Sequence, residues 1–186
     1  MDDNSRQLVE ACIRNERTAQ QQLYKLFAGK LFAVAVRYMK DREDAADVLQ
    51  EAFIKVYKNL ASFRFDCPLE AWLKRIVINT ALKALDKNKR MGQQIDNELV
   101  ANHLSVEATG VSQLSYEQLT ALINELPEGC RTIFNLYAIE GYKHHEIAEL
   151  LGVTEGTSKS QYSRAKGLLQ DRLATLKRQE IGYFKE

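Results

Sequence analysis

The chain has few residues that interrupt helices and few that could form cross-links. Only 2 of its 186 residues are proline and 9 are glycine, and no segment sustains the alternation of apolar and polar residues that predicts a sheet. The 3 cysteines, Cys12, Cys67 and Cys130, are odd in number and far apart. That spacing is typical of reduced cytosolic thiols and does not fit a disulfide framework. The scarcity of proline and glycine and the absence of an alternating pattern predict an all-α protein.

A long apolar run is also missing. The longest unbroken one, Leu31 to Val36, is far shorter than the roughly 20 residues that a membrane-spanning helix needs. The first ten residues, MDDNSRQLVE, are acidic and polar, unlike a secretory signal. With 45% hydrophobic and 27% charged residues, we expect a cytoplasmic protein with well-formed cores and no insertion into a membrane.

Finally, the chain has almost no net charge. Its formal charge of +1 hides a strong local asymmetry in the distribution of acidic and basic residues. Residues 41–51 contain five acidic side chains and one basic one. Residues 74–90 contain six bases against one acid, and residues 154–178 six bases against two acids. Two separate basic segments of this kind could each meet a phosphate backbone.

The apolar pattern divides the chain into two small helical domains. Apolar residues recur at helical spacing through residues 1–90 and again from residue 116 to residue 186. Residues 91–115 break the pattern, because they are rich in Gln, Asn, Ser and Gly, contain three acids and hold no Lys or Arg. We expect this segment to be a flexible acidic linker.

Residues 142–176 predict a helix-turn-helix, a unit that places its second helix in the DNA major groove. Ile147 and Leu150 are expected on the buried side of its first helix. Gly152 stands where a left-handed stop is needed, and Val153 is expected to fill the corner. Thr154 is a good N-cap for the second helix.

The second helix of this unit has two contrasting sides. Ser158, Tyr162 and Leu169 fall on one side, opposite a small, polar and cationic one. A solvated surface helix is the plain alternative, but the turn, the cap and the opposed sides agree on DNA binding. The candidate contacts are Thr154, Thr157, Lys159, Ser160, Ser163 and Arg164.

A second basic helix is predicted after Pro68. Arg75, Asn79, Lys83 and Lys87 step by four along one side of it, so three cations and an amide form a stripe that can track phosphates and reach a base edge. Solvated lysines on a surface helix are an equally good reading of this stripe alone. Phe63, Arg64 and Phe65 precede the helix.

Three long blocks in order resemble the extracytoplasmic-function (ECF) sigma factors of bacterial RNA polymerase. They are DAADVLQEAFIKVYKNLASFR, AWLKRIVINTALKALDKNKR and LPEGCRTIFNLYAIEGYKHHEIAELLGVTEGTSKSQYSRAKGLL. The resemblance implies a subunit that binds core polymerase and directs promoter-specific transcription initiation. Residues 1–90 would then bind polymerase and the −10 box, and residues 116–186 the −35 box.

The resemblance also implies roles for particular residues. Asp47, Gln50 and Glu51 would contact the clamp helices of the polymerase β′ subunit. Asn79 would read an unstacked −10 base, and Phe63, Arg64 and Phe65 would supply a stacking surface for it. The β flap and an anti-sigma factor are further implied partners. The chain departs from the family at Ser158 and Tyr162, where apolar residues are usual, and at Gln161, where Arg is usual.

Two other functions fit the same residues. The chain could be a conventional helix-turn-helix regulator whose first half senses a signal or dimerises, or a helical adaptor whose basic faces bind only proteins or RNA. We expect no enzyme, cofactor or small-molecule substrate, because no phosphate loop, nucleophile elbow or acid–base pair is found. Residues 145–149, HEIAE, lack the second His of the HExxH zinc motif, so no metal site is expected.

Overall fold

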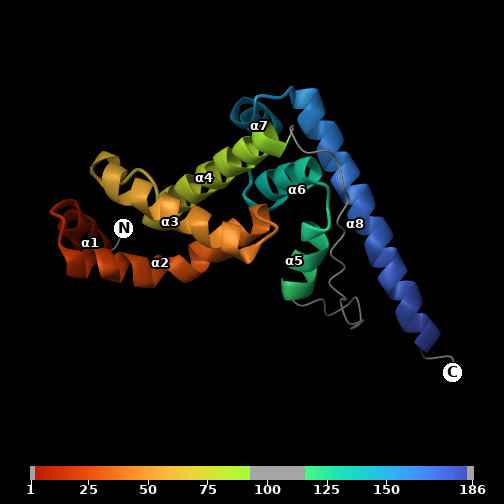
Figure 1. Cartoon of the computed structure of the whole chain (residues 1–186), viewed down its shortest axis with the longest axis horizontal. Helices are drawn as coiled ribbons and strands as arrows, with labels where there is room; N and C mark the ends of the chain where they lie inside the picture. The colour runs from red at the N-terminus through yellow and green to blue at the C-terminus, as the bar shows by residue number, and fades with distance from the viewer. Residues whose placement is uncertain (1–2, 93–115, 184–186) are drawn as a thin grey trace. The chain divides into compact units, whose positions relative to one another are not determined.

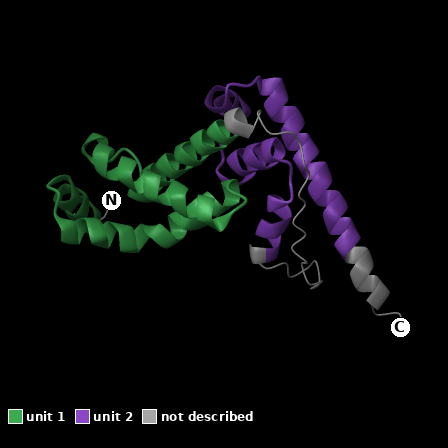
Figure 2. Ribbon diagram, in the orientation of Figure 1, with its two compact units in different colours: residues 1–96 green, residues 97–186 purple. Residues whose placement is uncertain are grey.

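The computed structural model describes residues 3–92 and 116–183. These residues form helices and turns, with no strand among them, so the all-α prediction is confirmed. The chain divides into two compact units, Met1–Asp96 and Asn97–Glu186 (Figure 2). Residues 93–115, most of the predicted acidic linker, lie outside the described residues.

The described residues of the N-terminal unit, 3–92, form four α-helices and a short 3-10 turn. They are α1 (Asp3–Ile13), α2 (Arg17–Tyr38), α3 (Arg42–Asn59), η1 (Leu60–Ser62) and α4 (Leu69–Gly92). The helices α2, α3 and α4 pack against one another, and α1 packs against α2 and η1 (Figure 1). These elements confirm that the helical spacing of apolar residues in this part of the chain marks helices.

Local polar groups fix where α3 and α4 begin. The Asp41 carboxylate accepts a hydrogen bond from the Glu43 N–H at 2.8 Å, which is the N-cap arrangement. Glu43 and Asp44 then place negative charge at the positive end of the α3 dipole. The Pro68 carbonyl accepts hydrogen bonds from the first turn of α4, so α4 starts one residue after the proline, as its fixed φ favours.

The core of the N-terminal unit is apolar and is shared by all its helices. Its fully buried side chains include Val9 of α1, Leu23, Leu31 and Tyr38 of α2, Val56 of α3, and Leu73, Val77 and Ile78 of α4. Because α4 buries this side, its opposite side is left for polar residues.

The C-terminal unit is a string of short helices that ends in a long one. Its elements are α5 (Tyr116–Asn124), α6 (Glu128–Phe134), the π-helical turn η3 (Asn135–Ile139), α7 (His144–Leu151) and α8 (Glu155–Tyr183). Pro127 is the N-cap residue of α6, and Gly141, at φ +79°, follows η3. Such a φ is open to glycine because it has no side chain to clash.

The core of this unit forms where α5 and α6 meet α8. It contains Leu122, Ile123, Leu126, Cys130, Ala165 and Leu169. Two sequence-based expectations of burial were wrong: Leu150 and Val153 are each more than a third exposed. Leu150 lies in α7, which presents a narrower buried stripe than the apolar pattern suggests, and Val153 lies in the turn that follows.

Among the described residues of this unit, Arg131 is the largest fully buried side chain, with 1% of its surface exposed. Its Nη1 donates to the Asn124 carbonyl at 3.2 Å, across the corner between α5 and α6. Burial lowers the pKa of Arg131, and the nearby Glu128 carboxylate partly opposes that effect. The guanidinium therefore fixes the α5–α6 corner from inside.

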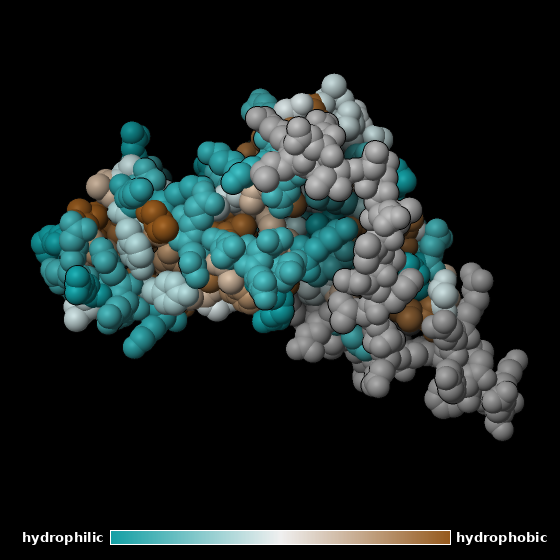
Figure 3. Space-filling view, viewed as in Figure 1, coloured by the Kyte–Doolittle hydropathy of each residue, from teal (hydrophilic) through white to brown (hydrophobic). Residues whose placement is uncertain are grey.

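The face of the molecule seen in Figure 3 is largely hydrophilic, with small separate hydrophobic patches over the N-terminal unit. No described helix is long and apolar enough to cross a membrane.

Candidate nucleic-acid interface

The turn between α7 and α8 has the geometry of a helix-turn-helix corner. Gly152 ends α7 in the left-handed region, at φ +65°, and the Val153 N–H bonds the Ala148 carbonyl at 3.1 Å. Thr154 then caps α8, because its hydroxyl accepts from the Thr157 N–H at 3.0 Å. The predicted stop and cap are therefore confirmed, and together they fix the direction in which α8 leaves the turn.

One side of α8 is exposed, small and cationic, and we call it the recognition face. It consists of Lys159, Ser160, Ser163 and Arg164, all exposed. Lys159 pairs with Glu155 one turn earlier at 2.7 Å, and this hydrogen bond is the main reason that the pKa of Glu155 is lowered. The Ser160 hydroxyl donates to the Thr157 carbonyl at 3.0 Å. Thr154 and Thr157 are exposed beside this face, with their hydroxyls 2.8 Å apart.

The opposite side of α8 explains two of the departures from the family pattern. Ser158 is fully buried, and its hydroxyl lies 2.9 Å from Nδ1 of His144, the first residue of α7. The His144 ring stacks on Tyr137 at a centroid distance of 4.2 Å, and Tyr162 packs against Tyr137 at 4.5 Å. Ser158 and Tyr162 thus replace an apolar contact by a hydrogen bond and a stack of rings that join α7 to α8.

Gln161, the third departure, also makes an internal contact. Its Oε1 accepts from the buried Cys130 thiol at 2.9 Å. Burial raises the pKa of Cys130, while the Arg164 charge works in the opposite direction. The thiol is therefore protonated at neutral pH, when it can donate this bond between α6 and α8.

The basic stripe of α4 lies on the side away from the core. Arg75, Lys83 and Lys87 are exposed, and Asn79 is half-buried. The neighbouring Thr80 is buried and donates to the Ile76 carbonyl at 2.8 Å. The structure therefore brings the four predicted stripe residues onto one accessible side of a single helix, which we call the α4 stripe.

Two aromatic rings of the loop before α4, Phe63 and Phe65, form a row with Trp72 in the first turn of α4. Phe63 lies 4.8 Å from Phe65 and 5.3 Å from Trp72, measured between ring centroids. Phe63 is only 6% exposed, whereas Phe65 and Trp72 are half-buried and Arg64 is exposed. The sequence placed both phenylalanines among the candidate base contacts. In the structure Phe63 is a core residue that supports the ring of Phe65.

The third candidate surface is the outer side of α3, where Asp47, Gln50 and Glu51 are all exposed; we call it the α3 face. Ile54 lies one turn further along the same side and is 54% exposed. Sequence reasoning missed Ile54, although its spacing of seven from Asp47 gives it the same direction on a helix. The α3 face therefore combines acids with an apolar side chain.

Lys55 is a second missed residue near this face. Its ammonium group lies 2.6 Å from the Glu51 carboxylate and also donates to the buried Thr80 hydroxyl at 3.2 Å. It therefore joins the α3 face to α4, one residue away from Asn79. The only sequence signal is the i,i+4 spacing of Glu51 and Lys55.

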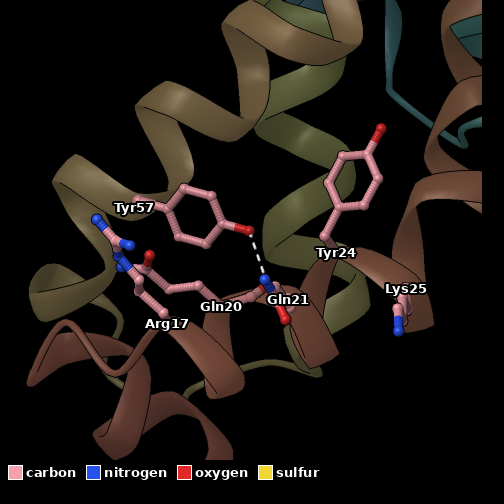
Figure 4. A pocket seen from close by; sticks show the side chains of 6 residues that line it. All are labelled: Arg17, Gln20, Gln21, Tyr24, Lys25 and Tyr57. Atoms are coloured by element: carbon pink, nitrogen blue, oxygen red, sulfur yellow. Dashed lines mark hydrogen bonds between the residues drawn. The ribbon is translucent and has the colours of Figure 1, made fainter.

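A groove of about 490 Å³ lies on α2 beside Tyr57 of α3. Its lining residues are Arg17, Gln20, Gln21, Tyr24, Lys25 and Tyr57 (Figure 4). The Tyr57 hydroxyl donates to the Gln20 carbonyl at 3.0 Å, and burial is the main cause that raises its pKa to about 12. The groove includes no residue of the recognition face, the α4 stripe or the α3 face. Among the described residues, no group of three or more His, Cys, Asp and Glu could hold a metal ion.

Comparison with known proteins matches the two units to two family models. Residues 23–91 match Sigma-70 region 2, and residues 116–169 match Sigma-70 region 4. The α4 stripe and the α3 face fall in the first match, and the recognition face falls in the second.

Whole-chain relatives are also sigma factors. The chain is 31% identical to the RNA polymerase sigma-H factor of Pseudomonas aeruginosa, covering 95% of this chain and 97% of the relative. It is 30% identical to the ECF RNA polymerase sigma factor SigM of Mycobacterium tuberculosis, over 88% and 81% of the two chains. It is 29% identical to the ECF RNA polymerase sigma-E factor of Haemophilus influenzae, over 91% and 95%.

A solved structure agrees with these matches. The sigma factor RpoE of Bartonella quintana, crystallised with the anti-sigma factor NepR, superposes with a TM-score of 0.56 at 25% identity, covering 83% of this chain and 96% of that one. The chain thus matches the models of Sigma-70 regions 2 and 4 in that order, and it is about 30% identical to sigma factors along nearly its whole length. This chain belongs to the ECF sigma factors, the promoter-specificity subunits of bacterial RNA polymerase.

Proposed function

We propose that this sigma factor reads its promoters with two cationic faces on separate units and binds core polymerase through a third, acidic one. The observation that carries the proposal is that the recognition face and the α4 stripe are exposed on different helices, each anchored by a buried apolar side. Residues 1–90 would form the polymerase-binding and −10 domain, and residues 116–186 the −35 domain. A non-catalytic role in the cytoplasm fits this division.

In this proposal the recognition face enters the major groove at the −35 box. Arg164 and Lys159 have the long cationic side chains that reach guanine edges or phosphates, and Ser160 and Ser163 are small enough for close approach. Thr154 and Thr157, at the N-terminal end of α8, would contact the backbone beside them, where the helix dipole also favours phosphate.

The −10 box would be held as a single strand by the N-terminal unit. Arg75, Lys83 and Lys87 would follow its phosphates, and Asn79 would hydrogen-bond an unstacked base. Phe65 and Arg64 would contact that strand directly. Phe63 would act from below by holding the Phe65 ring, since its own side chain is buried.

Core polymerase is the proposed partner of the α3 face. Asp47, Gln50 and Glu51 would contact the β′ clamp helices, with Ile54 supplying the apolar centre that protein interfaces usually have. The C-terminal unit would contact the β flap. The complex of the Bartonella quintana relative supports an anti-sigma factor as a further protein partner.

Run-off transcription with purified core polymerase tests the proposal. We expect promoter-dependent transcripts from the full chain, and strongly reduced core binding and transcription from the double variant Asp47→Ala, Glu51→Ala. Glu70→Ala is the matched control, because Glu70 is an exposed acid of α4 whose partner is Lys30. Duplex binding without initiation would instead indicate a conventional regulator. Failure to bind either core or DNA at low salt would favour an adaptor.

A further inference from the structure

Phe65 has a backbone conformation that aromatic residues rarely adopt. Its φ is +62°, in the left-handed region where a β-carbon crowds the backbone. Asn15 is the other described non-glycine residue with a positive φ, and asparagine tolerates that region well. A bulky residue persists there only when its surroundings hold it, and such residues gather at functional sites.

The surroundings that hold Phe65 come from two directions. Phe63 packs against it from the core side, in line with Trp72. On its other side, the guanidinium of Arg6 from α1 lies over the Phe65 ring, 5.3 Å from the ring centroid. The chain of rings that starts at Trp72 therefore ends in the planar cation of Arg6.

From Phe63 outward to Arg6, exposure rises at each step. Phe63 is buried, Phe65 is half-buried, and the Arg6 side chain is 66% exposed. Arginine planes and aromatic rings are the two kinds of surface on which proteins stack unpaired bases. Because the Arg6 guanidinium covers one face of the Phe65 ring, an unpaired base that approaches from that side would contact the guanidinium plane first.

The charge of Arg6 is already partly compensated. Its Nε lies 3.3 Å from the Glu10 carboxylate, one turn further along α1. A carboxylate at that distance repels phosphate, so the arrangement favours contact with the face of a neutral base over a phosphate contact. The planarity of Arg6 then matters more than its charge.

We propose that Arg6 and Phe65 together form the platform on which an unstacked base of the −10 strand stacks, which makes α1 part of the DNA-binding site. The inference rests on the proposed −10 role of the N-terminal unit. It goes beyond the family match, because that match begins at residue 23 and α1 ends at Ile13.

Holoenzyme made with the full chain, bound to a fork-junction promoter DNA with an unpaired −10 strand, tests the proposal. The strand carries 2-aminopurine at the unstacked position, so that stacking quenches its fluorescence. We expect Arg6→Ala and Arg6→Lys each to weaken binding about tenfold and to relieve the quenching, as loss of one stacking partner does. Lysine keeps the charge and loses the plane. Binding of Arg6→Lys at the wild-type level would overturn the proposal.

Arg14→Ala is the matched control. Arg14 is similarly exposed, near the end of α1, and pairs with Glu16 at 2.8 Å. We expect it to bind like the wild type, and an equal loss in both variants would reduce the effect to general charge and overturn the proposal. The salt dependence gives a second check. A slope of log K against log[salt] that falls by about one in Arg6→Ala would make Arg6 a phosphate contact and contradict the stacking role.

Removing the base tests whether Arg6 acts on it. With an abasic site at the unstacked position, wild type and Arg6→Ala should bind equally, and a persistent difference would overturn the proposal. Phe65→Ala separates this inference from the proposed function. If Phe65→Ala weakens binding and Arg6→Lys does not, only the role of Arg6 fails. If neither Phe65→Ala nor any Arg6 variant has an effect while Asn79→Ala weakens binding, the platform fails and the −10 assignment stands. If Asn79→Ala has no effect either, the −10 assignment itself fails.

Discussion

At the scale of single residues, the exposed cations of α8 do not all have the same surroundings. Arg164 lies on the recognition face, near enough to Cys130 for its charge to oppose the rise that burial causes in the pKa of that thiol. Arg172 lies two turns further on and pairs with Glu125 at 3.2 Å. The two arginines are thus a natural pair for separating DNA contact from general charge.

Arg164→Ala should weaken −35 recognition by about 1–3 kcal/mol if the guanidinium contacts a guanine bidentately. Arg172→Ala should leave recognition within experimental error. Holoenzyme affinity for promoters that carry single −35 substitutions measures both. An unchanged −35 preference in Arg164→Ala would remove this residue from the contact surface.

Tyr57 gives a prediction about pH. Burial first, and then Cys12 and Tyr24, raise the pKa of its phenol from 10.0 to about 12, so the fold prefers the neutral form. Its stabilising effect is fully present below pH 10 and is lost as the pH rises through about 12. Tyr57→Phe should cost about 1 kcal/mol near pH 8, because it removes the bond to the Gln20 carbonyl.

Urea unfolding of both proteins between pH 8 and pH 12 checks this sign. The difference in unfolding free energy between wild type and Tyr57→Phe should shrink toward the alkaline end. A difference that stays constant would show that the Tyr57 hydroxyl titrates equally in the folded and unfolded chains.

At the scale of elements, the connection between α7 and α8 depends on one residue. Gly152 is at φ +65° and no atom would meet an added β-carbon, so any cost of a side chain there comes from the backbone. Gly29, inside α2, also has open space around it but has an ordinary helical backbone.

Gly152→Ala should therefore destabilise the protein by about 1–2 kcal/mol. Gly29→Ala should stabilise it by about 0.5–1 kcal/mol, because alanine is the better helix former. Chemical unfolding measures both free energies, and hydrogen exchange assigns each to its unit. Equal effects of the two substitutions would contradict the left-handed geometry of the turn.

The α4 stripe leads to a prediction about promoter opening. Asn79→Ala should reduce open-complex formation more than closed-complex binding, since its partner base is exposed only after melting. Asn88→Ala is a suitable control, because Asn88 is an exposed residue near the end of the same helix. Permanganate reactivity of −10 thymines reports opening, and equal reactivity in wild type and Asn79→Ala would exclude the role.

The helices also show which features the sequence could predict and which it could not. Residues governed by local rules were placed correctly: the Thr154 cap, the Gly152 stop, and Ile147 on the buried side of α7. Residues whose environment depends on a distant segment were not. Periodicity carries no information about which stripe a neighbouring helix covers, and that choice is made by tertiary packing.

Three cases make the limit concrete. Phe63 was expected among the base contacts and is buried, because Phe65 and Trp72 close over it. Leu150 was expected to be buried and is exposed. Arg131 gave no signal at all, since a lone arginine near a helix start usually stays in solvent.

At the scale of the whole molecule, the two basic faces belong to two units with separate cores. Each face alone offers a few cations, and the −10 strand is accessible only in melted DNA. Joining both contacts in one complex raises affinity through effective concentration, without any new contact.

We therefore expect the free chain to bind double-stranded promoter DNA at least about 100-fold more weakly than the holoenzyme does, in the same salt. Fluorescence anisotropy with one labelled promoter, measured with and without core polymerase, checks this. Equal affinities would mean that a single unit supplies the binding free energy.

The position of Lys55 has a consequence for any protein that binds the α3 face. Its ammonium group divides its hydrogen bonds between the Glu51 carboxylate and the Thr80 hydroxyl. A cationic side chain of a partner protein that pairs with Glu51 must compete with Lys55, which lies one helical turn away on α3. The affinity of this face for a cationic partner is thus a difference between two ion pairs. If Lys55 loses Glu51, its remaining hydrogen bond is to Thr80 of α4, the helix that carries Asn79.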